Sequence, residues 1–337
     1  MKNSLCEKLE KFKRELYSIS GSSLFKNIDY EDCKRICEKA GHDDFIGSAL
    51  LELEKVIDSM KLDYDETHNN FHKKYWELFT YHFLKYEKRI CIDRIKETSS
   101  KTPDFQVTFN DKRFSLEVKT LNRVYPNLRY KEEQEEFLET KVKLEEKLRE
   151  EKIASAVNII QPYKGRDENY NDSSVALVIE TLISKIEHNL KLGQHPSSFD
   201  RRILWVVLEQ LPLFNEGKKV SVPVYPDFSY SCACISGELW YTCFGERGDL
   251  IFKPPEFEDR SNIDRRLEKD GIMKTHKEID GVVFLIVQLD GKKETVAFHR
   301  YDDSLLKEFF YTFADYTNND INENDYYYKL FPKKKKR

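Results

Sequence analysis

The sequence predicts an α/β protein in which a mixed central sheet is flanked by helices. Apolar residues recur at helical spacing through the first quarter of the chain, and the pattern then changes to the polar and apolar alternation of half-buried strands. A further helical segment lies between two predicted strands, which indicates a crossover connection. At 337 residues the chain can bury a large core, as one domain or as two smaller ones.

The N-terminal region, residues 1–60, is expected to form a helical cap. The segments "LCEKLEKFKREL" and "ALLELEKVIDSM" place apolar residues three or four positions apart, with charges between them. The same period continues in "NNFHKKYWELFTYHFLKYEK", where Trp76, Phe79 and Phe83 share one stripe. Strands are then predicted at "RICIDRI", "DFQVTF" and "RFSLEVK".

The rest of the chain continues the α/β pattern. Residues 131–152 carry Glu and Lys at helical spacing and predict a solvent-exposed helix. The segment "SVALVIETLISKIEHNLKLGQ" predicts a second helix, and "RILWVVLEQ" a strand buried on both faces. A hairpin is expected in "VVFLIVQLDGKKETVAFHR", with its turn at Asp290–Gly291, and residues 316–337 are expected to be a polar, then basic, mobile tail.

Composition excludes several classes of protein. With 56 Lys and Arg against 60 Asp and Glu, the chain lacks the basic excess of a protein that coats nucleic acid indiscriminately. Seven scattered cysteines favour a reducing, cytoplasmic location, and the spacing of Cys232, Cys234 and Cys243 favours buried thiols over structural zinc. The longest apolar runs are too short to cross a bilayer, so no membrane association is expected.

One predicted hairpin places charged side chains on a common face. If Asn110–Asp111 forms a two-residue turn, Asp104 stands opposite Glu117; moving the turn by one residue sets Asp104 opposite Lys119. Two facing carboxylates repel each other, and a cation between them explains the arrangement best. Oxygen ligands from a few protein groups, completed by water, are typical of a magnesium site open to phosphate.

These residues carry a resemblance to a known family. A Pro-Asp pair ending at Asp104, twelve intervening residues and then Glu117-x-Lys119 resemble the signature of the PD-(D/E)XK nuclease superfamily. Glu77 resembles the Glu that this family often places on the helix before its first core strand. The resemblance covers residues 71–120 and implies a restriction-endonuclease-like fold.

The resemblance also implies a domain organisation and a set of roles. The nuclease domain would span residues 61–315, with an insertion at about 121–172 that contains the charged helix. Asp104, Glu117 and the main-chain carbonyl of Val118 would bind Mg²⁺, for which Mn²⁺ is expected to substitute. Lys119 would serve the attacking water and offset charge on the transition state.

Other residues are assigned supporting roles. Glu77 would complete a second metal position or hold a metal-bound water, and Glu87 on the same helix is the alternative. Gln194 matches a place where related enzymes carry a supporting side chain. The basic end of the chain is expected to contact the nucleic-acid backbone through Lys333, Lys334, Lys335, Lys336 and Arg337.

The expected function is that of a Mg²⁺-dependent nuclease, with DNA as the favoured substrate and RNA as the alternative. A restriction or phage-defence endonuclease fits best, acting as a homodimer or with a partner protein that supplies targeting. Two alternatives stay open: a non-catalytic nucleic-acid-binding or scaffold protein on the same fold, and an RNase or repair exonuclease.

Overall fold

The fold is described from a computed structural model of the chain. The structure describes the following residue ranges: 4–20, 28–60, 66–95, 102–122, 130–150, 175–190, 198–209, 225–227, 232–235, 238–252, 263–287, 291–300, 302–317 and 328–330.

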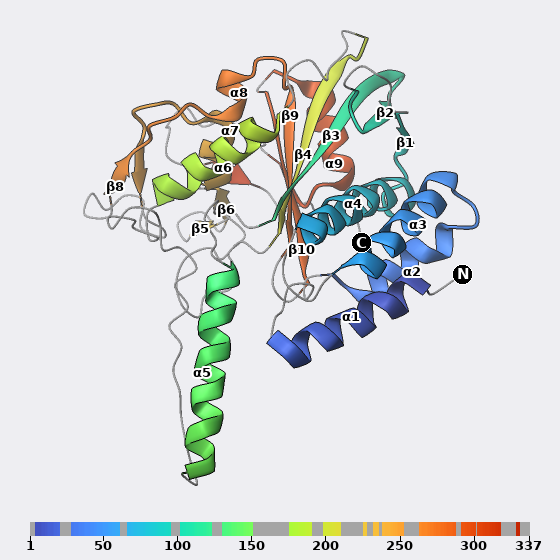
Figure 1. The fold of residues 1–337 in the computed structure, drawn as a ribbon. Coiled ribbons are helices and arrows are strands. Elements are labelled where there is room, and N and C mark those ends of the chain that lie inside the picture. The colour runs from blue at the N-terminus through green and yellow to red at the C-terminus, as the bar shows by residue number, and fades with distance from the viewer. Residues whose placement is uncertain are drawn as a thin grey trace.

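A mixed seven-stranded sheet forms the centre of the described part of the chain, in the order β1-β2-β3-β4-β9-β10-β11 (Figure 1). Its strands are β1 (Cys91–Arg94), β2 (Phe105–Phe109), β3 (Lys112–Asn122), β4 (Arg201–Glu209), β9 (Gly281–Val287), β10 (Lys293–His299) and β11 (Tyr316–Thr317). Strands β3, β4 and β9 run parallel, whereas β1, β2 and β10 are each antiparallel to a neighbour. The predicted α/β class and central mixed sheet are therefore confirmed.

Helices cover both faces of this sheet. The N-terminal helices are α1 (Ser4–Ser20), α2 (Tyr30–Lys39), α3 (Asp44–Ser59) and α4 (Glu66–His82), which continues into the π-helical turn η1 (Phe83–Glu87). The later helices are α5 (Tyr130–Glu150), α6 (Val175–Asn189), α7 (Glu238–Phe244), α8 (Ile272–Thr275) and α9 (Ser304–Phe313). Figure 1 shows α1–α4 on one side of the sheet, α6 and α7 on the other, and α5 standing away from both.

Two apolar cores follow from strand alternation. One joins α1–α4 and α9 to the sheet face that carries Phe114, Leu116 and Trp205. The other joins α6, α7 and α8 to the opposite face, which carries Leu204 and Val206. The helices expected in residues 1–60 thus share a core with the sheet.

The connection from β3 to β4 has the predicted crossover form. The two strands are parallel, with Phe114 opposite Arg201, and helices α5 and α6 lie between them in the chain. Strand β4 is buried over most of its length, as its continuous apolar run predicts. The solvated helix expected at 131–152 corresponds to α5.

The C-terminal third departs from the sequence-based expectation. Residues expected to begin a tail at 316 form β11, which pairs in parallel with β10, and β12 (Tyr328–Leu330) pairs with β6 (Cys232–Ile235). Short strands gain their stability from such distant partners, so a local polar pattern does not reveal them. Strand β5 (Tyr225–Asp227) completes this small sheet, and β7 (Leu250–Phe252) pairs with β8 (Ile263–Arg266).

The expected hairpin between β9 and β10 is present. Lys293 pairs with Val287, so five residues connect the strands, and Gly291 has a φ of 81°. Asp290 of the expected turn lies outside the described residues. Cys243 is buried, as expected, whereas the side chains of Cys232 and Cys234 lie outside the described part of the structure. None of the described helices combines the length and the apolar character that a membrane span requires.

Candidate functional site

The β2–β3 hairpin has the register that sets two carboxylates face to face. Asn110 and Asp111 both have positive φ, 48° and 58°, as a two-residue type I′ turn requires. Phe109 pairs with Lys112 and Phe105 with Leu116, so the next position sets Asp104 opposite Glu117. This is the register that the two-residue turn predicts.

Strand β3 extends beyond its partner at this point. Its last pair with β2 is Leu116, but β3 continues to Asn122. The Val118 amide donates to Asp104 Oδ2 at 2.7 Å, which holds the carboxylate against the strand edge. In a strand, the amide and carbonyl of one residue point to the same side, so the Val118 carbonyl also faces Asp104.

Glu117 and Lys119 form a buried ion pair beside Asp104. Their side chains are only 3% and 13% exposed, and the Lys119 ammonium donates to Glu117 Oε1. The other oxygen, Oε2, is buried and has no hydrogen-bond partner among the described residues. An unpartnered carboxylate oxygen is costly to bury, so a cation or a hydrogen-bond donor that contacts this oxygen would stabilise the site.

Burial and charge shift the titration of Asp104. Burial is the larger cause and the Glu117 carboxylate the second; together they raise the pKa of Asp104 from 3.8 to about 6. The Val118 amide and the Lys119 ammonium act in the opposite direction. The pair thus concentrates negative charge in a sparsely hydrated place, which a divalent cation would neutralise.

Glu77 lies at the edge of the same cluster. Its carboxylate pairs with Arg94 Nη1 on β1, and its side chain is 25% exposed. Burial, followed by the charge of Asp104, raises the pKa of Glu77, while Arg94 lowers it. The charges of Glu77 and Asp104 thus interact with each other.

Arg94 is a further charged residue beside the carboxylates, and the sequence patterns did not predict it. Its guanidinium lies 4.7 Å from the centre of the Phe45 ring and also lowers the pKa of Asp104. Arg94 pairs in register with Phe105, directly after Asp104. The predicted strand "RICIDRI" contained this signal, but the pairing of that strand with β2 was needed to place the guanidinium beside the carboxylates.

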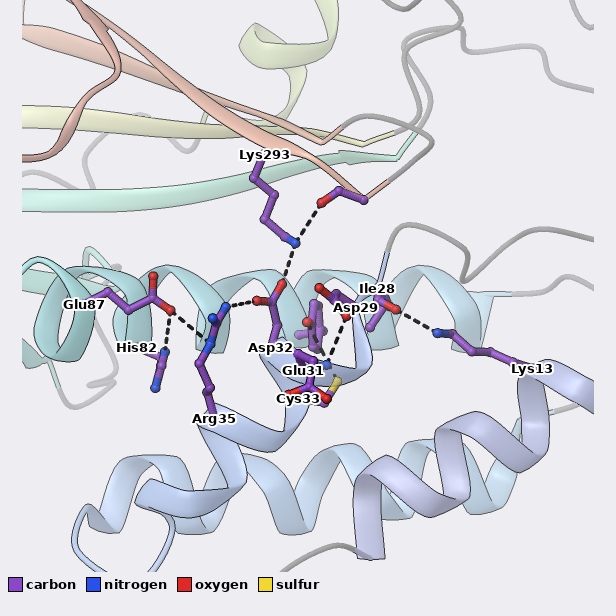
Figure 2. A network of polar contacts seen from close by, with 12 residues as sticks. Lys13, Ile28, Asp29, Glu31, Asp32, Cys33, Arg35, His82, Glu87 and Lys293 are labelled. Atoms are coloured by element: carbon purple, nitrogen blue, oxygen red, sulfur yellow. Dashed lines mark hydrogen bonds and ion pairs between the residues drawn. The ribbon is translucent and has the colours of Figure 1, made fainter. Parts of the chain in front are cut away.

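Glu87, the alternative to Glu77, belongs to a different network (Figure 2). It lies 3.6 Å from Arg35 Nε and 3.7 Å from His82 Nδ1. Arg35 in turn contacts Asp32, which Lys293 of β10 approaches at 2.5 Å. This network ties α2 and η1 to the sheet, so Glu87 has a structural partner set of its own.

The other residues that the sequence assigns to the site are not among those that the structure describes. Gln194 and the basic run 333–337 lie outside the described residues. Within the described ranges, no group of three or more His, Cys, Asp and Glu side chains is arranged to hold a metal ion. The structure brings together two facing carboxylates, Asp104 and Glu117, and Glu117 Oε2 has no partner among the described residues. Glu77 is nearby but is engaged by Arg94.

This donor set fits a hard divalent cation. Carboxylate and carbonyl oxygens are the ligands that Mg²⁺ takes from proteins, and Mg²⁺ keeps several waters when few protein ligands are offered. Comparison with family models, with curated proteins and with solved structures finds no match for this chain.

Proposed function

We propose that the protein is a Mg²⁺-dependent phosphodiesterase that hydrolyses DNA. The observation that carries the proposal is the pair formed by half-buried Asp104 and buried Glu117, which face each other. Glu117 Oε2 has no partner among the described residues, and the Lys119 ammonium lies beside the pair. The resemblance of this hairpin to the PD-(D/E)XK signature supports a restriction-endonuclease-like form of the fold. Asp104, Glu117 and the Val118 carbonyl would hold the cation.

A bound Mg²⁺ would supply charge neutralisation at the phosphate and a more acidic water. The Val118 amide orients Asp104, so the carboxylate keeps a defined position on the edge of β3. Lys119, 13% exposed, holds a positive charge next to Glu117 that can be offered to a phosphate oxygen or to the attacking water. Arg94 adds a second positive charge on the Glu77 side.

One observation favours a second candidate function, a non-catalytic nucleic-acid-binding or scaffold protein. Glu117 is paired with Lys119 and Glu77 with Arg94, and such internal pairs also occur in a site without chemistry. The two candidates differ in one respect: only a phosphodiesterase consumes its substrate.

A cleavage assay separates these functions. We expect the purified full-length chain to cut plasmid or linear DNA in the presence of Mg²⁺ or Mn²⁺ and to leave it intact in EDTA. Products from closed circular plasmid identify an endonuclease, whereas products from linear DNA alone identify an exonuclease. Cleavage of RNA in place of DNA would assign the RNase alternative, and binding without cleavage of any nucleic acid would favour the scaffold.

A further inference from the structure

A pocket lies along β3, and its lining on that strand begins at Thr120, directly after Lys119. It has a volume of about 570 Å³, the size of a pocket for a small organic ligand. Residues of α4, β3 and α6 line it: Asn69, Lys73, Thr120, Leu121, Thr181, Ser184, Lys185, His188 and Asn189.

The pocket lies where β3 continues beyond Leu116, the partner of the first residue of β2. Thr120 and Leu121 directly follow Lys119, and consecutive strand residues point to opposite faces of a sheet. A pocket lined by both residues therefore wraps around the edge of β3 that β2 leaves uncovered after Leu116. The same uncovered edge carries the Asp104 contact at Val118.

Helix α4 also connects the pocket with the site. Asn69, Lys73 and Glu77 are spaced four residues apart, so they follow one another along a single face of the helix. Glu77 faces the carboxylate cluster and Lys73, one turn earlier, lines the pocket. A chain-like ligand held at the carboxylates and running along this face of α4 would reach the pocket.

The lining has the chemistry of an anion site. It carries two lysines, a histidine, hydroxyl groups and amides, and none of the described residues that line it is Asp or Glu. A third ammonium lies nearby, because Lys269 Nζ donates to Ser184 Oγ at 2.6 Å. Lys73 is exposed and has no ion-pair partner among the described residues, whereas its neighbour Lys74 pairs with Glu52 at 2.5 Å.

We propose that this pocket binds the backbone phosphate of a nucleotide adjacent to the scissile phosphodiester, with Lys73 and Lys185 as its cationic contacts. The assignment of a nucleic-acid ligand rests on the proposed function. Leu121 and the threonines Thr120 and Thr181 offer contacts to the sugar, and the volume accommodates a whole nucleotide rather than a phosphate group alone. By holding one nucleotide, the pocket would determine which phosphodiester of the nucleic-acid strand reaches the carboxylates.

Two single variants on α4 form a matched test. Lys73→Gln removes a charge from the pocket, and Lys74→Gln removes the same charge one residue away, from a side chain that faces Glu52. Affinity is measured by fluorescence anisotropy in EDTA, with a labelled single-stranded oligodeoxynucleotide and a labelled duplex, over a range of salt. Lys185→Gln provides an independent arm from α6.

We expect Lys73→Gln and Lys185→Gln each to weaken binding roughly tenfold at low salt, the scale of a charged contact. Each should also make the plot of log affinity against log salt less steep. For a single strand, the magnitude of the negative slope should fall by about 0.7, the value for one phosphate contact. Lys74→Gln should bind with the wild-type slope. Equal affinities and slopes for Lys73→Gln and Lys74→Gln would overturn the pocket assignment, as would a wild-type chain that binds neither probe.

Cleavage kinetics distinguish this inference from the proposed function. We expect Lys73→Gln to raise KM for DNA with kcat changed by a few-fold at most, because the pocket contact is made equally in the ground state and the transition state. If the wild-type chain cleaves DNA and the pocket variants have an unchanged KM, the pocket assignment is rejected and the proposed hydrolytic function stands. Pocket-dependent binding by a chain that hydrolyses nothing rejects the hydrolytic function and supports the pocket.

Discussion

Asp104→Asn is expected to lower the rate of Mg²⁺-dependent cleavage by a factor on the order of a hundred or more. The substitution keeps the size of the side chain and an oxygen that can accept from the Val118 amide, but it removes one of two carboxylates in a site with few protein ligands. Glu117→Gln should have the same effect. The measurement is the single-turnover rate at saturating Mg²⁺, with circular dichroism to verify folding.

The same variant should be more stable than wild type when no metal is present. The pKa of Asp104 in the folded state, about 6, lies above its ordinary value of 3.8, so ionised Asp104 disfavours folding. This cost, up to roughly 3 kcal/mol, is fully present above pH 6 and disappears as the pH falls from 6 towards 4. In EDTA, Asp104→Asn should therefore melt higher than wild type at pH 8 and lose that advantage at pH 4.

Asp93→Asn is the matched control for this variant. Asp93 is on the neighbouring strand β1, opposite Gln106, and is exposed. Its substitution should change neither cleavage nor the melting temperature appreciably. A cleavage rate of Asp104→Asn equal to that of Asp93→Asn would mean that the carboxylate pair has no part in catalysis.

Lys119→Met should slow cleavage by a factor on the order of a hundred while the cation still binds. Met retains most of the stem but lacks the ammonium group, so charge assistance to the water or the transition state is lost. Among the described residues, the Glu117 carboxylate then loses the single side chain that it pairs with, and both of its oxygens become available to metal. Single-turnover cleavage at saturating Mg²⁺ measures the effect.

The melting temperature of Lys119→Met shows separately whether the cation still binds. Because Lys119→Met leaves a buried carboxylate unpaired, it should melt lower than wild type in EDTA and recover in Mg²⁺.

Lys119→Arg preserves the charge and should retain more activity than Lys119→Met. Lys112→Met, on an exposed side chain at the start of the same strand, is the control that should cleave normally. Full activity of Lys119→Met would reduce Lys119 to a structural ion-pair partner.

The sequence predicted the parts of the site that local patterns determine. Alternation in β2 and β3 and the turn residues set the register, and with it the meeting of Asp104 and Glu117. Helical period placed Glu77 on α4, but not its pairing with Arg94, because that contact joins a helix to a strand through tertiary packing. The helix α7, within "GELWYTCFG", was likewise not predicted, since seven residues give too short a window for a periodic signal.

The pocket residues could not be predicted from the sequence. Lys73 and Lys185 are separated by more than a hundred residues, and each reads in the sequence as one more charge on an amphipathic helix. The two side chains meet in one pocket because β2 begins only at Phe105, which leaves the later part of β3 without this partner, and because α4 and α6 pack around β3 there. Exposed lysines carry no sequence signal that separates a ligand contact from a solvated surface.

Calorimetric titration of Mn²⁺ into the metal-free chain at pH 8 tests the central claim that Asp104 and Glu117 together hold a divalent cation. The site described here predicts saturable binding to wild type, binding preserved in Lys119→Met, and binding lost in both Asp104→Asn and Glu117→Gln, with Asp93→Asn unchanged. Wild-type protein that binds no Mn²⁺, or carboxylate variants that bind it as wild type does, would contradict the claim.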